Sequence, residues 1–145
     1  VVTLAAKHKG ICRGELGGSE QAMFSLGEII VDRYDGVVYI GGPGASSLVK
    51  DSAALRIARD AHAKRKVIGA ICIAPTIIAA AGVLKDRKAT VWNGDGTQSG
   101  VLSKSGAKYT GELLTVDGLV ITANGPMAAA SFGSKLAEML KKRPL

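Results

Sequence analysis

A cysteine, Cys72, stands where an apolar segment, Val67–Ile71, passes sharply into an alanine-rich run that contains Pro75. This is the arrangement in which α/β enzymes hold a nucleophile, with the side chain exposed on the turn between a strand and the following helix. Unpaired backbone N–H groups and the dipole at a helix N-terminus favour the thiolate, so such a cysteine is reactive without a neighbouring base. A small buried core cysteine is an equally ordinary interpretation.

A second strand end carries the glycine-rich turn Gly41-Gly42-Pro43-Gly44, directly after the apolar run Asp35–Ile40. Ligands of open α/β sheets bind beyond the C-terminal ends of the strands, so this turn and Cys72 are expected at one edge. The N–H of Gly42, together with that of Cys72 or Ile73, would then form an oxyanion hole. A tight strand-to-helix turn is the plainer interpretation, because the glycine pattern does not match a phosphate-binding loop.

Further residues at or after strand ends are candidates for a pocket wall. They are Gly41, Trp92, Asn93 and Asn124, with Asp95 nearby. Asx residues beside glycine also serve ordinary turns, and the sole tryptophan is expected as a wall or an interface anchor rather than a catalytic group. The two cysteines, at positions 12 and 72, have neither a disulfide framework nor a metal-ligand spacing, so no metal and no cofactor is expected.

Composition indicates one domain, residues 1–145, because a chain of 145 residues with 47% hydrophobic side chains buries one sizeable core. No apolar run reaches the roughly 18 residues that a membrane span needs. With no signal peptide and only two distant cysteines, the expected location is the reducing cytoplasm.

The net charge of +7 raises the question of a nucleic-acid partner. The basic residues are scattered over Lys64–Lys66, Lys85–Lys88 and Lys141–Arg143, and aromatic residues make up only 4% of the chain. We therefore expect solvated helix ends and no nucleic-acid binding.

Strands and helices alternate along the chain, which predicts a three-layer, doubly wound α/β fold. Strands are expected over 1–6, 35–40, 67–71, 88–92, 113–116 and 119–123, a small hairpin around 14–18, and helices over 52–65, 75–82 and 127–142. A loop is expected over 93–100, and it begins a further segment that ends near Gly106.

Three groups of residues together resemble the DJ-1/PfpI superfamily of glutamine-amidotransferase-like proteins. They are 34–44, 70–75 with 81–85, and 116–118 with 121–126, in the family's order. The resemblance implies a flavodoxin-like three-layer α/β/α sandwich with a mainly parallel sheet, which forms homodimers or higher homo-oligomers. It also implies that Cys72 is the elbow cysteine of the family.

The chain departs from the family at the positions where histidine is expected. Protease-type members carry a histidine directly after the cysteine, where this chain has Ile73, and deglycase-like members carry one near the position of Trp92. The histidines here are His8 and His62. We expect His62 to be a solvated surface residue and His8 not to be catalytic, so a proteolytic triad within one chain is not expected.

The family's glutamate partner of the cysteine follows its first β-strand, and neither Glu15 nor Glu20 matches it. The chain therefore resembles a family domain without its first β-α unit, of roughly 30 to 40 residues. Without that central strand, buried backbone groups would lack partners, so residues 1–145 are not expected to fold alone.

By this resemblance, the chain is a cysteine-dependent enzyme acting on small reactive carbonyls, of glyoxalase or deglycase type, with Gly42 and Ile73 as the oxyanion hole. One alternative is an intracellular peptidase or amidohydrolase whose base comes across an oligomer interface. The other is a redox-sensing or chaperone-like stress protein in which Cys72 is oxidised to the sulfinic acid. Cys12 is expected to have a surface or packing role and Arg13 to be solvated. No membrane or nucleic-acid partner is expected.

Overall fold

The main sheet has four strands in the order β5-β6-β10-β9 in a computed structural model that describes residues 1–143. The strands are β5 (Gly36–Ile40), β6 (Val67–Ile71), β10 (Val120–Ala123) and β9 (Leu114–Asp117). The first three are parallel, and β9 is antiparallel to β10. All of β6 is buried, which agrees with its unbroken apolar sequence and its central place in a sheet covered on both faces.

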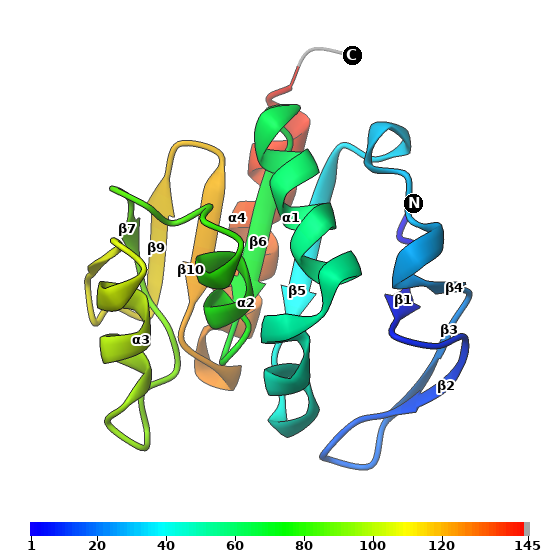
Figure 1. The fold of residues 1–145 in the computed structure, drawn as a ribbon, viewed down its shortest axis with the longest axis horizontal. Coiled ribbons are helices and arrows are strands. Elements are labelled where there is room, and N and C mark those ends of the chain that lie inside the picture. The colour runs from blue at the N-terminus through cyan, green and yellow to red at the C-terminus, as the bar shows by residue number, and fades with distance from the viewer. Residues whose placement is uncertain (144–145) are drawn as a thin grey trace.

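Helices cover both faces of this sheet (Figure 1). Helices α1 (Ser52–Ala63) and α2 (Pro75–Ala80) lie in front of it, with α3 (Gln98–Lys104) beside α2, and α4 (Ala129–Lys141) lies behind. Helix α1 turns an apolar stripe to the sheet, consisting of Ala54, Ile57, Ala58 and Ala61. The result is the three-layer, flavodoxin-like α/β/α sandwich that the sequence predicts.

The first 33 residues form a separate lobe of short elements. Strand β1 (Ala5–Ala6) pairs in parallel with β4 (Phe24–Ser25), and β2 (Gly10–Arg13) forms a hairpin with β3 (Ser19–Ala22). Two 3₁₀ turns, η1 (Leu26–Glu28) and η2 (Val31–Arg33), then lead to β5. The hairpin turn Gly14–Gly18 is where the sequence predicts it, closed by a bond from Gly14 N–H to the Gly18 carbonyl at 2.7 Å.

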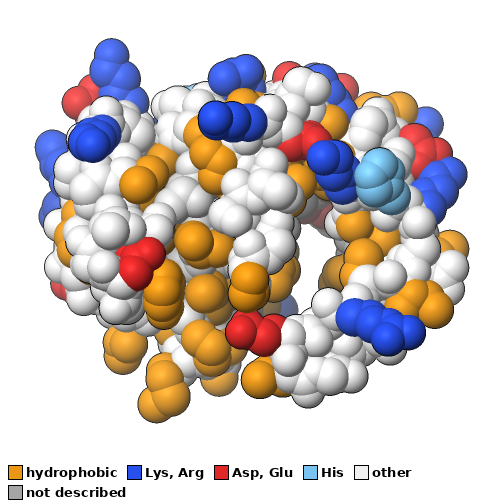
Figure 2. Space-filling view, turned by 60° about the horizontal axis from the view of Figure 1, so that its bottom comes forward, with side chains coloured by type: hydrophobic (Ala, Val, Ile, Leu, Met, Phe, Trp, Pro, Cys, Tyr) orange, Lys and Arg blue, Asp and Glu red, His pale blue; other side chains and the backbone are white. Residues whose placement is uncertain are grey.

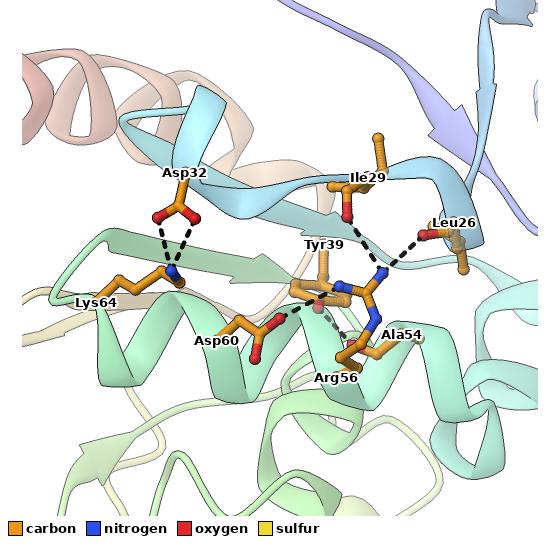
Figure 3. A network of polar contacts seen from close by, with 8 residues as sticks. All are labelled: Leu26, Ile29, Asp32, Tyr39, Ala54, Arg56, Asp60 and Lys64. Atoms are coloured by element: carbon orange, nitrogen blue, oxygen red, sulfur yellow. Dashed lines mark hydrogen bonds and ion pairs between the residues drawn. The ribbon is translucent and has the colours of Figure 1, made fainter.

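The N-terminal lobe packs Ile29 and Val31 into the main hydrophobic core and is hydrogen-bonded to the main body through α1. Arg56 donates to the carbonyls of Leu26 and Ile29, both at 3.2 Å, and Lys64 binds Asp32 at 2.6 Å (Figure 3). None of the strands β1 to β4 is hydrogen-bonded to β5, and an opening separates the lobe from the rest of the molecule in the space-filling view (Figure 2). Strand β5 is therefore an edge of the main sheet in the described part of the chain.

Several elements differ from the sequence prediction. The strand expected over 88–92 is only β7 (Lys88–Ala89), paired with β8 (Lys108–Tyr109). The next N–H, of Thr90, donates to the side chain of Thr122 on β10 at 2.9 Å and not to a backbone carbonyl, so it does not continue the ladder. The strand expected over 1–6 is limited to the two residues of β1. The glycine turn continues into η3 (Pro43–Lys50), and the last helix begins with the 3₁₀ turn η4 (Pro126–Ala128). Within residues 1–143, no helix is both long enough and apolar enough to cross a membrane.

Candidate active site

Cys72 occupies a sharp turn between β6 and α2. Its φ of 65° is in the left-handed region, which costs a residue other than glycine on the order of 1 to 3 kcal/mol. The turn is held from both sides: Cys72 N–H donates to the Ala123 carbonyl at 2.9 Å, and Trp92 N–H donates to the Cys72 carbonyl at 2.8 Å. The ends of neighbouring segments thus impose the backbone geometry of a nucleophile elbow.

Gly41 lies directly against this turn. Its N–H donates to the Ile71 carbonyl at 3.1 Å. A Cβ atom at position 41 would lie 2.6 Å from the Ile71 oxygen, 2.7 Å from the Ile73 nitrogen and 2.9 Å from the Cys72 Cβ. Any larger residue would therefore displace the elbow, and glycine is required here for a close approach of two strand ends.

Two backbone N–H groups beside Cys72 have no acceptor. Neither Gly42 N–H nor Ile73 N–H donates a hydrogen bond to any group within residues 1–143. A Cβ atom at Gly42 would meet nothing within 4 Å, so the space beside it is open. The side chain of Cys72 is half-buried and forms no disulfide. Two unused donors at a half-exposed thiol are the elements from which an oxyanion hole is made.

A cavity of about 360 Å³ adjoins the elbow on the side of Ile73. Its walls come from η3, α2 and α3, and consist of Ser46, Ser47, Val49, Lys50, Ile73, Thr76, Gln98 and Val101. Apart from Ile73, none of these residues is predicted from the sequence, since their proximity depends on the unpredicted η3 and α3. Figure 2 shows hydrophobic side chains gathered at this end of the main body.

The remaining predicted pocket residues have different surroundings. Trp92 is 37% exposed, and its ring lies so close to Gly94 that a Cβ there would be 2.6 Å from it. The Asn93 side chain accepts from Ser99 N–H at 3.0 Å and so caps the start of α3. Asn124 is half-buried and is bonded through its backbone N–H to the Leu113 carbonyl.

Asp95 belongs to the turn before α3. Its carboxylate accepts from Gln98 and from Thr97, and these bonds, that from Gln98 foremost, lower its pKa. The carboxylate is therefore engaged in ordinary turn chemistry.

Neither histidine is placed at the elbow. His8 is exposed between β1 and β2, and His62 lines a cavity at the opposite ends of the strands. Glu15 and Glu20 are exposed in the hairpin. Among residues 1–143, no side chain hydrogen-bonds to the Cys72 sulfur, and no group of three His, Cys, Asp or Glu residues could hold a metal ion.

Comparison with known proteins identifies relatives along almost the whole chain. An uncharacterized protein of Methanocaldococcus jannaschii is 33% identical over 142 residues, which are 97% of this chain and 69% of that protein. The deglycase PfpI of Pyrococcus furiosus is 27% identical over 140 residues, 97% of this chain and 82% of the relative.

A glutathione-independent glyoxalase of Caenorhabditis elegans is 29% identical over 108 residues, which are 74% of this chain and 56% of that enzyme. Among solved structures, a ThiJ/PfpI domain protein from Brachyspira murdochii superposes with a TM-score of 0.91, covering 98% of this chain and 80% of that one. At 24% identity, this match concerns the fold alone. The DJ-1/PfpI family model matches residues 1–139, and the chain therefore belongs to the DJ-1/PfpI family.

Proposed function

We propose that this protein is a cysteine-dependent enzyme in which the Cys72 thiolate attacks the carbonyl carbon of a small aldehyde. The observation that carries the proposal is the pair of N–H groups, of Gly42 and Ile73, that have no acceptor within residues 1–143. They follow Gly41 and Cys72 directly in the chain, and these two residues lie against each other at the elbow. The names of two relatives, a deglycase and a glyoxalase, support carbonyl chemistry of this kind.

The first step forms a bond between the Cys72 sulfur and the aldehyde carbon, while the carbonyl electron pair moves onto oxygen. The N–H groups of Gly42 and Ile73 stabilise this oxyanion, and its protonation gives a hemithioacetal. With a 2-oxoaldehyde, two protons then move: the former aldehyde hydrogen goes, as a proton, to the neighbouring carbon, and the hemithioacetal hydroxyl proton goes to the oxygen on that carbon. The product is the Cys72 thioester of a 2-hydroxy acid. Hydrolysis then releases a 2-hydroxy acid and regenerates the thiol, so the net reaction adds water and needs no oxidant.

The proton transfers need a group that carries the proton. Within residues 1–143, no side chain that could do so is hydrogen-bonded to the Cys72 sulfur. We assign this role to water or to a carboxylate from outside these residues. The cavity beside Ile73, with Val49 and Val101 as apolar walls and the Thr76 hydroxyl among them, suits a small, weakly polar substrate.

The test is the conversion of methylglyoxal to lactate by the unaltered protein and by the variants Cys72→Ala and Cys72→Ser. We expect both variants to lose at least about a hundredfold in kcat/KM, because the nucleophile is removed. Cys12→Ser is the matched control, since Cys12 is exposed on β2 and should leave turnover unchanged. Turnover that survives in Cys72→Ala would refute the proposal.

Redox sensing is the second candidate, favoured by the half-exposed Cys72 thiol that forms no disulfide. Peroxide should then convert Cys72 to the sulfinic acid before it oxidises the more exposed Cys12, with no turnover of aldehydes. Mass spectrometry of the two cysteine-containing peptides after a peroxide titration distinguishes this function from the first. A peptidase would need a base at the elbow, which the described residues do not provide.

A further inference from the structure

A second cavity, of about 310 Å³, lies at the end of the main sheet opposite to Cys72. Ile68 and Val120, from the first residues of β6 and β10, form part of its wall, whereas Cys72 follows the last residue of β6. The rest of the wall comes from basic side chains and from the turn between β9 and β10. The full lining is His62, Arg65, Lys66, Ile68, Arg87, Gly118, Leu119 and Val120. Residues distant in sequence thus place the side chains of two arginines and a lysine around one cavity.

Few carboxylates oppose these charges. Asp117 lies 3.8 Å from the Arg87 guanidinium, and its other oxygen accepts from Lys88 N–H at 2.8 Å. Asp32 binds Lys64 at 2.6 Å, and the hydrogen bond from Lys64, with the charges of Lys64 and Lys66, lowers the pKa of that carboxyl. Arg65 forms no ion pair within the described residues, so the cavity keeps a positive charge.

Two backbone features bring the arginines to the cavity. Arg65 has a φ of 53° just after the end of α1, a left-handed position usually occupied by glycine. Gly118, with a φ of 60°, leaves room for the Arg87 guanidinium, which would lie 3.2 Å from a Cβ atom at that position. An arginine stands here although glycine would adopt this conformation at lower cost, which favours a function for its side chain.

We propose that this cavity binds a small phosphorylated molecule through Arg65, Lys66 and Arg87. Guanidinium groups bind phosphate with paired hydrogen bonds, and lysine adds a point charge. The volume is at the lower end of small-molecule sites, which run from about 300 to 1,000 Å³. A nucleic acid would instead need a long basic groove with aromatic side chains for stacking, and the cavity lining contains no Phe, Tyr or Trp. This site is independent of Cys72.

The test is calorimetric titration of the protein with pyrophosphate at low salt. The double variant Arg65→Gln with Lys66→Gln should raise Kd at least about tenfold, because two charge-assisted contacts are lost. The matched control is Lys7→Gln with Arg13→Gln, which removes the same two residue types from exposed positions of the N-terminal lobe and should leave Kd unchanged. An equal loss in both double variants, or no pyrophosphate binding by the unaltered protein, would overturn the proposal.

A second variant guards against loss of folding. Arg87→Lys keeps the charge and the possibility of an ion pair with Asp117 but removes the planar pair of donors, so pyrophosphate should bind several-fold more weakly with an unchanged melting temperature. A short single-stranded RNA is titrated in parallel. If the RNA binds and pyrophosphate does not, the cavity lined by Arg65, Lys66 and Arg87 belongs to a nucleic-acid surface, and the proposal of a small-molecule site is wrong.

Discussion

The two adjacent glycines after β5 have different structural roles. Gly41 lies against the elbow, where a Cβ would come within 2.6 Å of the Ile71 oxygen, whereas a Cβ on Gly42 would point into open space. Gly41 is therefore required for packing. Gly42 instead has open space beside it, and its N–H donates to no acceptor within residues 1–143.

We expect Gly41→Ala to lower the free energy of unfolding by about 2 kcal/mol, because the added methyl group overpacks fixed backbone atoms. Gly42→Ala is the matched control and should change it by less than about 0.5 kcal/mol. Urea unfolding followed by circular dichroism measures both variants. Equal stability of the two proteins would show that the elbow is free to shift away from position 41.

Individual site residues can be predicted from the sequence where a residue type, in its local pattern, fits few structural positions. Cys72 between an apolar strand and a proline identifies the turn, and the glycine pair identifies the strand end beside it. The sequence does not show that the Asn93 oxygen caps α3, because the partner, Ser99 N–H, is fixed only when that helix forms.

At the scale of elements, β6 matches its predicted residues 67–71 because an unbroken apolar run has one favourable place, the middle of a parallel sheet. Helix α3 is not predicted, since its seven residues include a glycine and bury only Leu102. The cavity beside Ile73 depends on α3 and η3, so most of its wall is also missed. The basic runs look like separate helix ends in sequence, yet the fold brings Lys66 and Arg87 to one cavity.

The join between β4 and η1 depends on Glu28. Its carboxylate binds Lys9 at 2.6 Å and accepts from Ser25 N–H and hydroxyl at 2.8 Å. These contacts, that with Lys9 first, lower its pKa from 4.5 to about 2. A depressed folded-state pKa means that the contribution to stability is complete above pH 4.5 and is lost as the pH falls towards about 2.

We therefore expect the N-terminal lobe to loosen between pH 4.5 and about 2, before acid unfolds the main sheet. Amide hydrogen exchange of β2 and β3 as a function of pH, referenced to β6 and corrected for intrinsic exchange, measures the effect. In the Glu28→Gln variant the increase in exchange between pH 4.5 and about 2 should be absent. If the increase persists, another carboxylate causes it.

At the scale of the whole molecule, the two ends of the main sheet differ chemically. The end with Cys72 carries exposed apolar side chains such as Met127 and Leu113, at 91% and 58% exposure, and Figure 2 shows apolar side chains gathered there. The other end has the cavity lined by Arg65, Lys66 and Arg87. A small carbonyl compound and a phosphorylated molecule would therefore bind at opposite ends without competing.

The opening beside β5 has a further consequence, for the association of separate chains. Strand β5, Gly36–Ile40, contains neither proline nor a charged residue, and Val38 and Ile40 on it are 39% and 69% exposed. Proteins usually protect a sheet edge with such residues, because an open edge pairs with strands of other molecules.

We expect Val38→Lys to reduce concentration-dependent association, measured by sedimentation velocity, because a charge at the edge opposes pairing. Val116→Lys is the matched control at 38% exposure, since it lies on β9, which β7 contacts. Equal behaviour of the two variants would remove β5 as the contact. If the prediction holds, a synthetic peptide that pairs with β5 as a strand would prevent association of the chains. The opening beside β5 would then be a site through which the solubility of the protein can be controlled.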